Sequence, residues 1–350
     1  MKLFRVNLAY VCFLLMGIVL AVMVGLMALH IFVAGDEADS TGAQFSPASR
    51  VMQTGTREFT IALVSDTATN NRVLEKVMSD IAPADNGYAF VLYLGDLSKD
   101  YLADNYWMLQ RVRPYLGGVP MWFTPGNHDV TRREDTNKLH WRNVFGESYY
   151  WFSYGDVLFI SLDTSADVID EEQFDWLEHT MEYVRPHFRR CVVFSHQPPI
   201  VPVNPDGKSF DHMMDEASAR RLGRILRRHK IDAMFFGHVH YWSRGSFRGI
   251  PVYTLPSAGQ VSRMESDGYG YVVVKFGRRA IESVTPKYVE FSGPVRDSKI
   301  AWIRNNIVPY KARRSVRWLS PVWASLMILG LMFASRRYQA RRMRTGATES

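Results

Sequence analysis

The chain has 350 residues, of which 47% are hydrophobic and 22% charged, enough for one large domain with a full core or two small ones. Its net charge of +7 comes from the ends: residues 1–34 carry two cations and no acid, and residues 311–350 carry nine cations and one acid. The residues between are therefore net negative, which argues against nucleic acid as their partner. Cys12 and Cys191 lie in apolar runs and do not indicate a disulfide framework.

The first predicted element is an apolar, uncharged run from Val6 to Ala34. It is longer than the roughly 20 residues that cross a bilayer, and longer than the apolar part of a cleaved signal peptide. We therefore expect residues 1–34 to be a retained N-terminal transmembrane anchor. Residues 35–56 are rich in small and polar types, which predicts a linker.

Between residues 57 and 292, short apolar runs alternate with helical patterns. Apolar residues at three- and four-residue spacing predict helices over 70–82, 171–184 and 216–230. This alternation predicts an α/β domain. Runs typical of strands buried on both faces cover 59–66, 88–96, 119–129, 156–163, 190–199 and 232–240, and two later runs without an intervening helix cover 250–259 and 268–276.

The C-terminal part is predicted to return to the membrane. Residues 293–317 are expected to be a juxtamembrane segment, 318–335 a second transmembrane helix, and 336–350 a basic tail. A core or interfacial helix is the alternative for 318–335. Because cations flank the outer ends of both spans, both termini are expected in the cytoplasm, which places the domain on the periplasmic or extracellular side of what we expect to be a bacterial inner membrane.

Several predicted strands end in a polar side chain. Because ligands of open α/β sheets bind beyond the carboxyl ends of the strands, we expect these side chains to meet at one edge. Carboxylate, amide and imidazole donors together suit divalent ions such as manganese, iron or zinc. Taken singly, each has a structural alternative, such as a helix cap, a turn or a buried core histidine. The set comprises Asp66, Asp96, Asn127, His196, His238 and His240.

The segments "VSDTA", "LGDLS", "PGNHD", "SHQPP" and "GHVH", in this order within about residues 59–290, resemble those of the calcineurin-like metallophosphoesterases. The resemblance implies an αββα sandwich, in which two packed mixed sheets carry flanking helices, and two divalent metal ions. It implies that Asp96 bridges both ions and that Asp66 and His240 belong to the first site. The second site would be completed by Asn127, His196 and His238.

The resemblance also implies the catalytic groups. His128 would act as general acid toward the leaving oxygen, and Asp129 would orient and charge its ring. An imidazolium held by a carboxylate can donate a proton near neutral pH. Water activated by the ions would attack the phosphorus atom in line.

The first motif departs from the family pattern. The family usually has a ligand histidine two residues after the first aspartate, where this chain has Ala68. Purple acid phosphatases, one branch of the family, use a tyrosine three residues after the bridging aspartate, where this chain has Lys99. Water or a neighbour such as Asn70 could complete the first site, its ion could bind weakly, or catalysis could be lost.

We therefore expect a membrane-anchored phosphoesterase that hydrolyses a phosphate ester or pyrophosphate bond in a small-molecule or lipid-linked substrate. The alternative is a catalytically weak or inactive binding or scaffold protein of the same fold. A third interpretation, a cytoplasmic phosphatase acting on proteins, requires the opposite membrane topology.

Overall fold

The computed structural model describes the central part of the chain. The predicted anchor at 1–34, except for Gly17, and the segments predicted at 293–317, 318–335 and 336–350 lie outside the described residues. Within the described part, no helix combines the length and the apolar character that crossing a bilayer requires. The described residues are 17, 50–52, 56–67, 71–82, 86–97, 119–130, 141–142, 145–200, 213–260 and 268–291.

A five-stranded sheet carries the first motifs, in the strand order β12-β11-β2-β3-β4. The strands β2 (Phe59–Val64), β3 (Tyr88–Leu94) and β4 (Met121–Thr124) run parallel to one another. On the other side of β2, the strand β11 (Gly270–Phe276) pairs antiparallel with β2, and β12 (Ile281–Tyr288) pairs antiparallel with β11. The carboxyl ends of β2, β3 and β4 therefore lie at one edge.

A seven-stranded sheet carries the later motifs, in the order β1-β5-β6-β7-β8-β10-β9. The adjacent strands β6, β7, β8 and β10 run parallel to one another. The strand β5 pairs antiparallel with β6, and β9 pairs antiparallel with β10. The strands are β1 (Arg50–Met52), β5 (Tyr150–Tyr154), β6 (Val157–Ser161), β7 (Arg190–Ser195), β8 (Ala233–Phe236), β9 (Ser243–Phe247) and β10 (Ile250–Thr254).

The strand β1 falls inside the segment 35–56, which the sequence predicts to be a linker. It pairs in parallel with β5, with Arg50 opposite Phe152 and Met52 opposite Tyr154. The chain thus joins the seven-stranded sheet before residue 57, where the predicted domain begins. A three-residue edge strand is too short to show the periodicity of a strand in the sequence.

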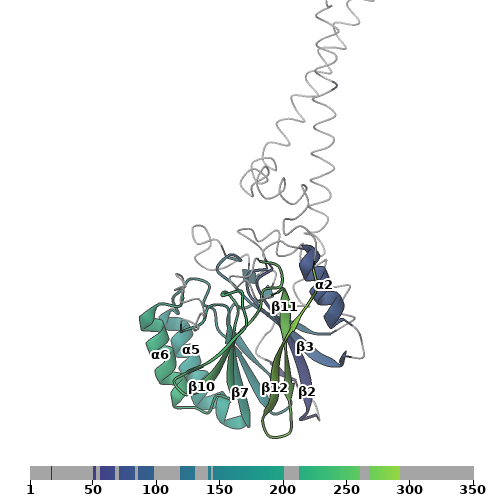
Figure 1. The fold of residues 1–350 in the computed structure, drawn as a ribbon. Coiled ribbons are helices and arrows are strands. Elements are labelled where there is room, and N and C mark those ends of the chain that lie inside the picture. The colour runs from purple at the N-terminus through teal and green to yellow at the C-terminus, as the bar shows by residue number, and fades with distance from the viewer. Residues whose placement is uncertain are drawn as a thin grey trace, which may run out of the picture. The chain divides into compact units, whose positions relative to one another are not determined.

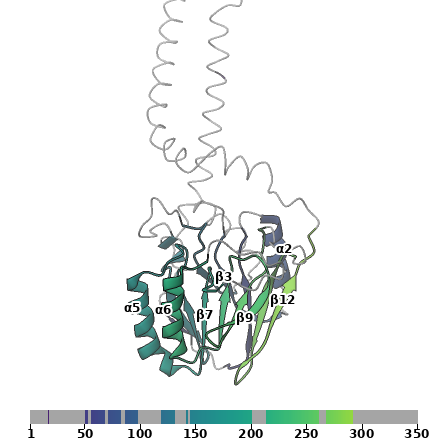
Figure 2. The same ribbon diagram turned by 60° about the vertical axis from the view of Figure 1, so that its left-hand side comes forward.

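The two sheets pack face to face, with helices on their outer sides (Figures 1 and 2). Side chains of both sheets form the apolar layer between them, which includes Phe90 and Phe159. The helix α2 (Asn71–Ile81) packs on the five-stranded sheet. The helices α5 (Glu171–His179) and α6 (Glu216–Arg227) pack on the seven-stranded sheet. The predicted α/β sandwich of two mixed sheets is confirmed for the described residues.

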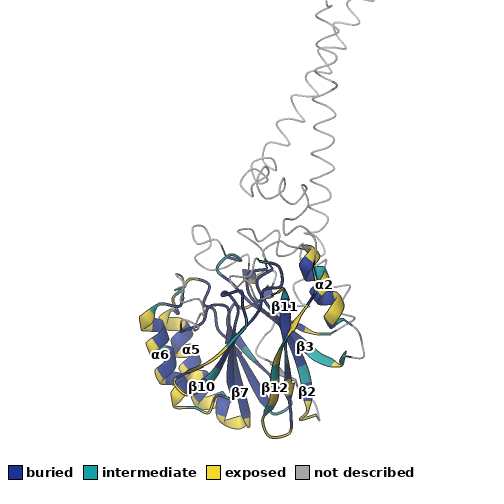
Figure 3. Ribbon diagram, viewed as in Figure 1, coloured by how far each residue is buried: buried dark blue, intermediate teal, exposed yellow. Residues whose placement is uncertain are grey.

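The helices α5 and α6 begin at capping aspartates and bury one face each (Figure 3). The Asp170 carboxylate accepts a hydrogen bond from the Gln173 amide at the start of α5, and Asp215 caps α6 in the same way. Beyond α5 the chain continues through a π-helical turn, Thr180–Val184, and a 3₁₀ turn, Arg185–His187. The helix predicted over 171–184 is therefore α-helical only in its first part.

Aromatic stacking fixes one sheet against the other. The ring of Trp122 on β4 stacks on Phe152 of β5 with 4.1 Å between centroids, and Phe276 on β11 meets Phe159 of β6 edge to face at 5.7 Å. Phe90 on β3 meets Phe159 on β6 edge to face at 5.2 Å. Each such pair contributes about 0.5–1.5 kcal/mol beyond area burial. The rigid sandwich holds the carboxyl ends of strands from both sheets at a common edge.

Candidate metal centre

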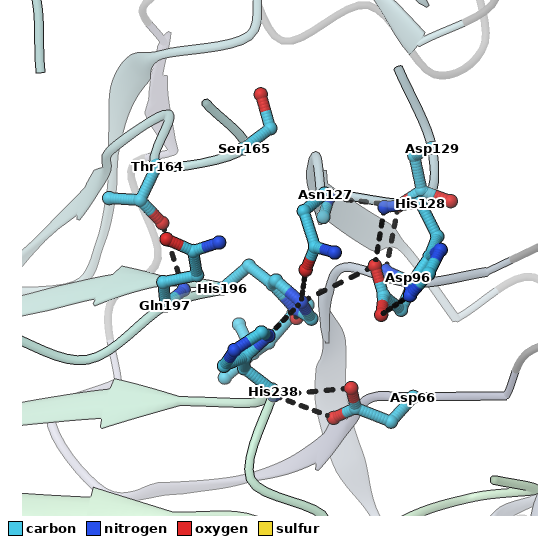
Figure 4. A network of polar contacts seen from close by, with 12 residues as sticks. Asp66, Asp96, Asn127, His128, Asp129, Thr164, Ser165, His196, Gln197 and His238 are labelled. Atoms are coloured by element: carbon cyan, nitrogen blue, oxygen red, sulfur yellow. Dashed lines mark hydrogen bonds and ion pairs between the residues drawn. The ribbon is translucent and has the colours of Figure 1, made fainter. Parts of the chain in front are cut away.

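The side chains predicted to bind metal follow five strands of the two sheets and lie together at this edge (Figure 4). Asp66 follows β2, Asp96 follows β3 and Asn127 follows β4. His196 follows β7, and the pair of histidines from "GHVH" follows β8. Hydrogen bonds and other close polar contacts connect every one of the six predicted ligands to another member of the set: Asp66, Asp96, Asn127, His196, His238 and His240.

Four of these residues have a left-handed backbone, which is uncommon for residues other than glycine. Their φ angles are 58° at Asp66, 56° at Asp96, 68° at His238 and 60° at His240. Only two other non-glycine residues of the described part, Asp167 and Arg248, also have a positive φ angle. Such strain costs on the order of 1–3 kcal/mol per residue and concentrates at functional sites.

Glycines make room for the carboxylates. A Cβ atom on Gly126 would lie 2.2 Å from Oδ1 of Asp96, and one on Gly237 would lie 2.8 Å from Oδ2 of Asp66. These approaches are closer than real Cβ atoms tolerate. The glycines of "PGNHD" and "GHVH" are therefore required by the packing around the two carboxylates.

The predicted second site centres on His196. Its Nδ1 donates to the carbonyl oxygen of Leu94 at 2.8 Å, which leaves Nε2 facing the other groups. That Nε2 atom lies 3.1 Å from Oδ1 of Asn127, 3.3 Å from Oδ1 of Asp96 and 3.2 Å from Nδ1 of His238. The four groups predicted for this site thus converge on one point.

The predicted first site is a buried group of two carboxylates and one imidazole. Asp66, Asp96 and His240 each offer a ligand atom within 4.8 Å of the other two. Nε2 of His240 lies 3.3 Å from Oδ1 of Asp66. Both oxygens of Asp66 also accept the backbone N–H of His238, at 3.1 and 3.0 Å. Such a donor set fits a divalent cation.

The charges in this site are balanced by histidines. Burial raises the pKa of Asp66 and Asp96, but the neighbouring His240 and His196 outweigh burial and lower both pKa values below the usual range. Burial lowers the pKa of His196, yet Asp96 outweighs it and raises that pKa to about 10. Without a metal ion, the proton on His196 supplies positive charge beside the carboxylates. A bound divalent ion would supply that charge instead.

The predicted acid His128 is partly accessible, with 33% of its side chain exposed. Its backbone N–H donates to Oδ1 of Asp96 at 3.0 Å, and its Nε2 lies 4.0 Å from Oδ2 of Asp96. Asp129 is buried, and its Oδ2 accepts the backbone N–H groups of Asp96 at 2.7 Å and Gly126 at 2.9 Å. Asp129 therefore holds the loop, and its action on the His128 ring stays a prediction.

Gln260, which follows β10, lies at the site but was not predicted from the sequence. Nε2 of Gln260 lies 3.4 Å from Oδ2 of Asp96. A sequence signal for Gln260 was present. Like the six predicted ligands, it is a polar residue that follows a strand, here after a turn that contains a glycine. Tyr93 was not predicted either. Its hydroxyl forms a hydrogen bond with Thr67, and burial raises its pKa well above the ordinary value.

Three residues that bear on the irregular first motif lie outside the described part of the chain: Ala68, the candidate replacement ligand Asn70, and Lys99.

The calcineurin-like phosphoesterase family model matches residues 59–242, just over half of the chain. The chain belongs to the calcineurin-like phosphoesterase family. The match covers all the motifs that carry the six converging side chains.

Two relatives bear the name of probable cyclic nucleotide phosphodiesterase. The one from Pseudoalteromonas sp. (strain SM9913) is 23% identical over 171 residues, 48% of this chain and 62% of the relative's length. The one from Rhodococcus erythropolis (strain PR4) is 26% identical over 240 residues, 61% of this chain and 75% of the relative. A solved structure of PhoD has a TM-score of 0.50 at 12% identity and covers 78% of this chain and 80% of its own, which shows a similar fold.

Proposed function

We propose that the chain is a metal-dependent phosphoester hydrolase. The observation that supports this best is the convergence of donors from five strands on one buried edge, where Asp96 contacts members of both predicted metal sites. Family membership supports the same reaction class. A purely structural set of capping aspartates and core histidines gives no reason for four strained backbones at a single edge.

Two divalent ions, manganese, iron or zinc, would be held by the two halves of the site. Asp66, Asp96 and His240 would hold the first ion. Such ions, when bound, acidify water and neutralise charge on phosphoryl oxygens. The second ion would be held by Asp96, Asn127, His196 and His238.

His128 would give its proton to the leaving oxygen. It is exposed enough to meet a substrate, and Nε2 of its ring faces Asp96, whose negative charge favours the protonated imidazole. Asp129 would act by holding the "PGNHD" loop in place through its two backbone hydrogen bonds.

A phosphodiester is the substrate class to test first, because two relatives are named for cyclic nucleotide phosphodiesterase activity. Lipid-linked phosphates are the second class, because the sequence predicts membrane anchors at 1–34 and 318–335. We propose that both termini lie in the cytoplasm of a bacterium and that the catalytic domain lies on the periplasmic side.

The test combines metal content with the loss of the acid. The full chain should contain two divalent ions and hydrolyse phosphodiesters. In His128→Asn we expect kcat to fall about 10²–10⁴-fold for esters with poor leaving groups, because general acid catalysis contributes that much. For aryl esters, whose leaving groups need no proton, we expect a smaller loss.

Metal content of His128→Asn is the control, since the residue is not a proposed ligand and the ions should remain. A chain that binds no metal, or one ion only, and is inert across esters would contradict the proposal and favour the binding or scaffold protein. Equal losses for all leaving groups would remove the acid role from His128.

A further inference from the structure

The turn after β10 is attached to the first carboxylate of the site. Oγ of Ser257 donates to the carbonyl oxygen of Asp66 at 2.8 Å, and the backbone N–H of Gln260 donates to the same oxygen at 2.9 Å. The N–H of Ala258 donates to the carbonyl of Ser65 at 2.9 Å. These three hydrogen bonds fix the backbone of Gln260 beside Asp66.

The two oxygens of Asp96 face different neighbours. Oδ1 lies 3.3 Å from Nε2 of His196 and accepts the backbone N–H of His128. Oδ2 is the atom that Nε2 of Gln260 approaches at 3.4 Å. If Asp96 bridges two ions, its Oδ1 belongs to the second site with His196, and its Oδ2 is left for the first site. The half-buried amide of Gln260 lies beside that Oδ2 atom.

The group of Asp66, Asp96 and His240 offers three protein donors. Manganese prefers about six, mostly oxygen, ligands, so this site has positions left to fill. The residue two positions after Asp66 is Ala68, whose side chain offers no donor. The side-chain amide of Gln260 carries a neutral carbonyl oxygen, and rotation of its last torsion exchanges the oxygen with the NH₂ group.

We propose that Gln260 is a ligand of the first metal site, through its side-chain oxygen Oε1. Without a cation its NH₂ group donates to Asp96, and with a cation the amide turns its oxygen to the ion. This inference depends on the two-ion function proposed above, and it assigns to the turn after β10 the donor that the first motif does not provide.

The experiment measures metal binding rather than turnover. The full chain is stripped with chelator and titrated with Mn²⁺ by calorimetry, with bound metal counted by mass spectrometry. Co²⁺ absorption spectra report the ligand environment. In Gln260→Ala we expect the weaker of two Mn²⁺ dissociation constants to rise about tenfold or more, with the tighter one unchanged, as for loss of a metal-site partner.

Gln260→Glu separates a ligand from a residue that merely holds Asp96. A carboxylate ligand adds negative charge to the cation, so we expect this variant to bind the weaker ion at least as tightly as the wild type and to change the Co²⁺ spectrum. A residue that acts only as a donor to Asp96 would, as glutamate, repel that carboxylate and weaken the site. Weaker binding in Gln260→Glu therefore overturns the proposal.

Unchanged binding in both variants also overturns it. The exposed Ser246→Ala on β9 is the surface control, and far-ultraviolet circular dichroism checks that each variant is folded. If Gln260→Ala does not fold, Gln260→Asn, whose amide is one methylene shorter, takes its place. A wild-type chain that binds no metal refutes the proposed function itself, whereas two tight ions in every Gln260 variant refute only this inference.

Discussion

Strained backbones and close glycine contacts place the side chains of the candidate metal centre. Asp66 and Asp96 leave their strands in left-handed conformations, and the carboxylate of Asp96 lies where a Cβ atom on Gly126 would be. A conformation of this kind persists only when hydrogen bonds and packing around it are worth more than its strain. The site is therefore sensitive to single atoms added beside it.

Adding one methyl group at Gly126 should damage the site. A Cβ atom there would lie 2.2 Å from Oδ1 of Asp96, so in Gly126→Ala we expect the carboxylate to move, Mn²⁺ affinity to fall at least tenfold, and activity to fall with it. Gly245→Ala is the matched control, because nothing lies within 4 Å of its new Cβ atom. Normal Mn²⁺ binding by Gly126→Ala would show that Asp96 is not a ligand.

The metal-free site should depend on pH through His196. The folded state raises its pKa to about 10, so its contribution to stability is complete below the ordinary value of about 6.5 and is lost as the pH rises through 10. In chelator, the difference in unfolding free energy between wild type and His196→Gln should therefore shrink from pH 6.5 to 10. Urea unfolding measures it, with the exposed His187→Gln as control. A difference that grows with pH would mean that the buried imidazole is neutral.

At the scale of elements, Arg190 joins the two sheets at the ends of β2 and β7 remote from the metal centre. Its guanidinium donates to the carbonyl oxygens of Gly277 at 2.6 Å and Arg57 at 3.2 Å, and it forms an ion pair with Asp156. Gly277 follows β11 and Arg57 precedes β2, so a residue of the seven-stranded sheet is tied to the five-stranded one. Its side chain is only 3% exposed.

Removing the partner of this arginine should destabilise the fold. In Asp156→Ala the guanidinium keeps its charge in a buried position, and we expect a loss near the lower end of about 3–5 kcal/mol, because Asp156 is partly exposed. Glu171→Ala breaks the exposed pair with Arg221 and should cost less than about 1 kcal/mol. Urea unfolding of the full chain compares the two. Equal losses would mean that Arg190 reaches water once Asp156 is gone.

The strands that sequence analysis found are those buried on both faces. The strands β2, β3, β7 and β8 are almost completely buried and were predicted at nearly their observed places. Of the strands at or next to a sheet edge, β4, β10 and β11 were predicted, whereas β1, β5, β9 and β12 were not. The edge strands β9 and β12 contain mostly exposed or half-exposed residues and show no apolar run, because one face or one edge meets solvent.

At the scale of the whole molecule, the predicted anchors decide where the substrate must be. If residues 1–34 and 318–335 both span a bilayer, the chain stays in the membrane fraction after an alkaline carbonate wash. In intact spheroplasts, protease should then cut within residues 35–49, ahead of β1, while epitope tags on both termini stay protected. Permeabilised cells are the control, in which the tags are cut as well. Cleavage of the tags in intact spheroplasts would reverse the topology.

By itself, the sequence determined the fold class, the family and the candidate ligands, because buried strands and polar strand ends leave a local trace in the residue pattern. The tertiary structure alone showed which atoms of these candidate ligands face one another. The two oxygens of Asp96 face His196 and Gln260, which lie 100 and 164 positions further along the chain. No local pattern encodes such contacts, because the packing of two sheets sets which strand ends meet. Gln260 is a polar residue after a strand, but only the packing of the two sheets shows that it lies beside Asp96.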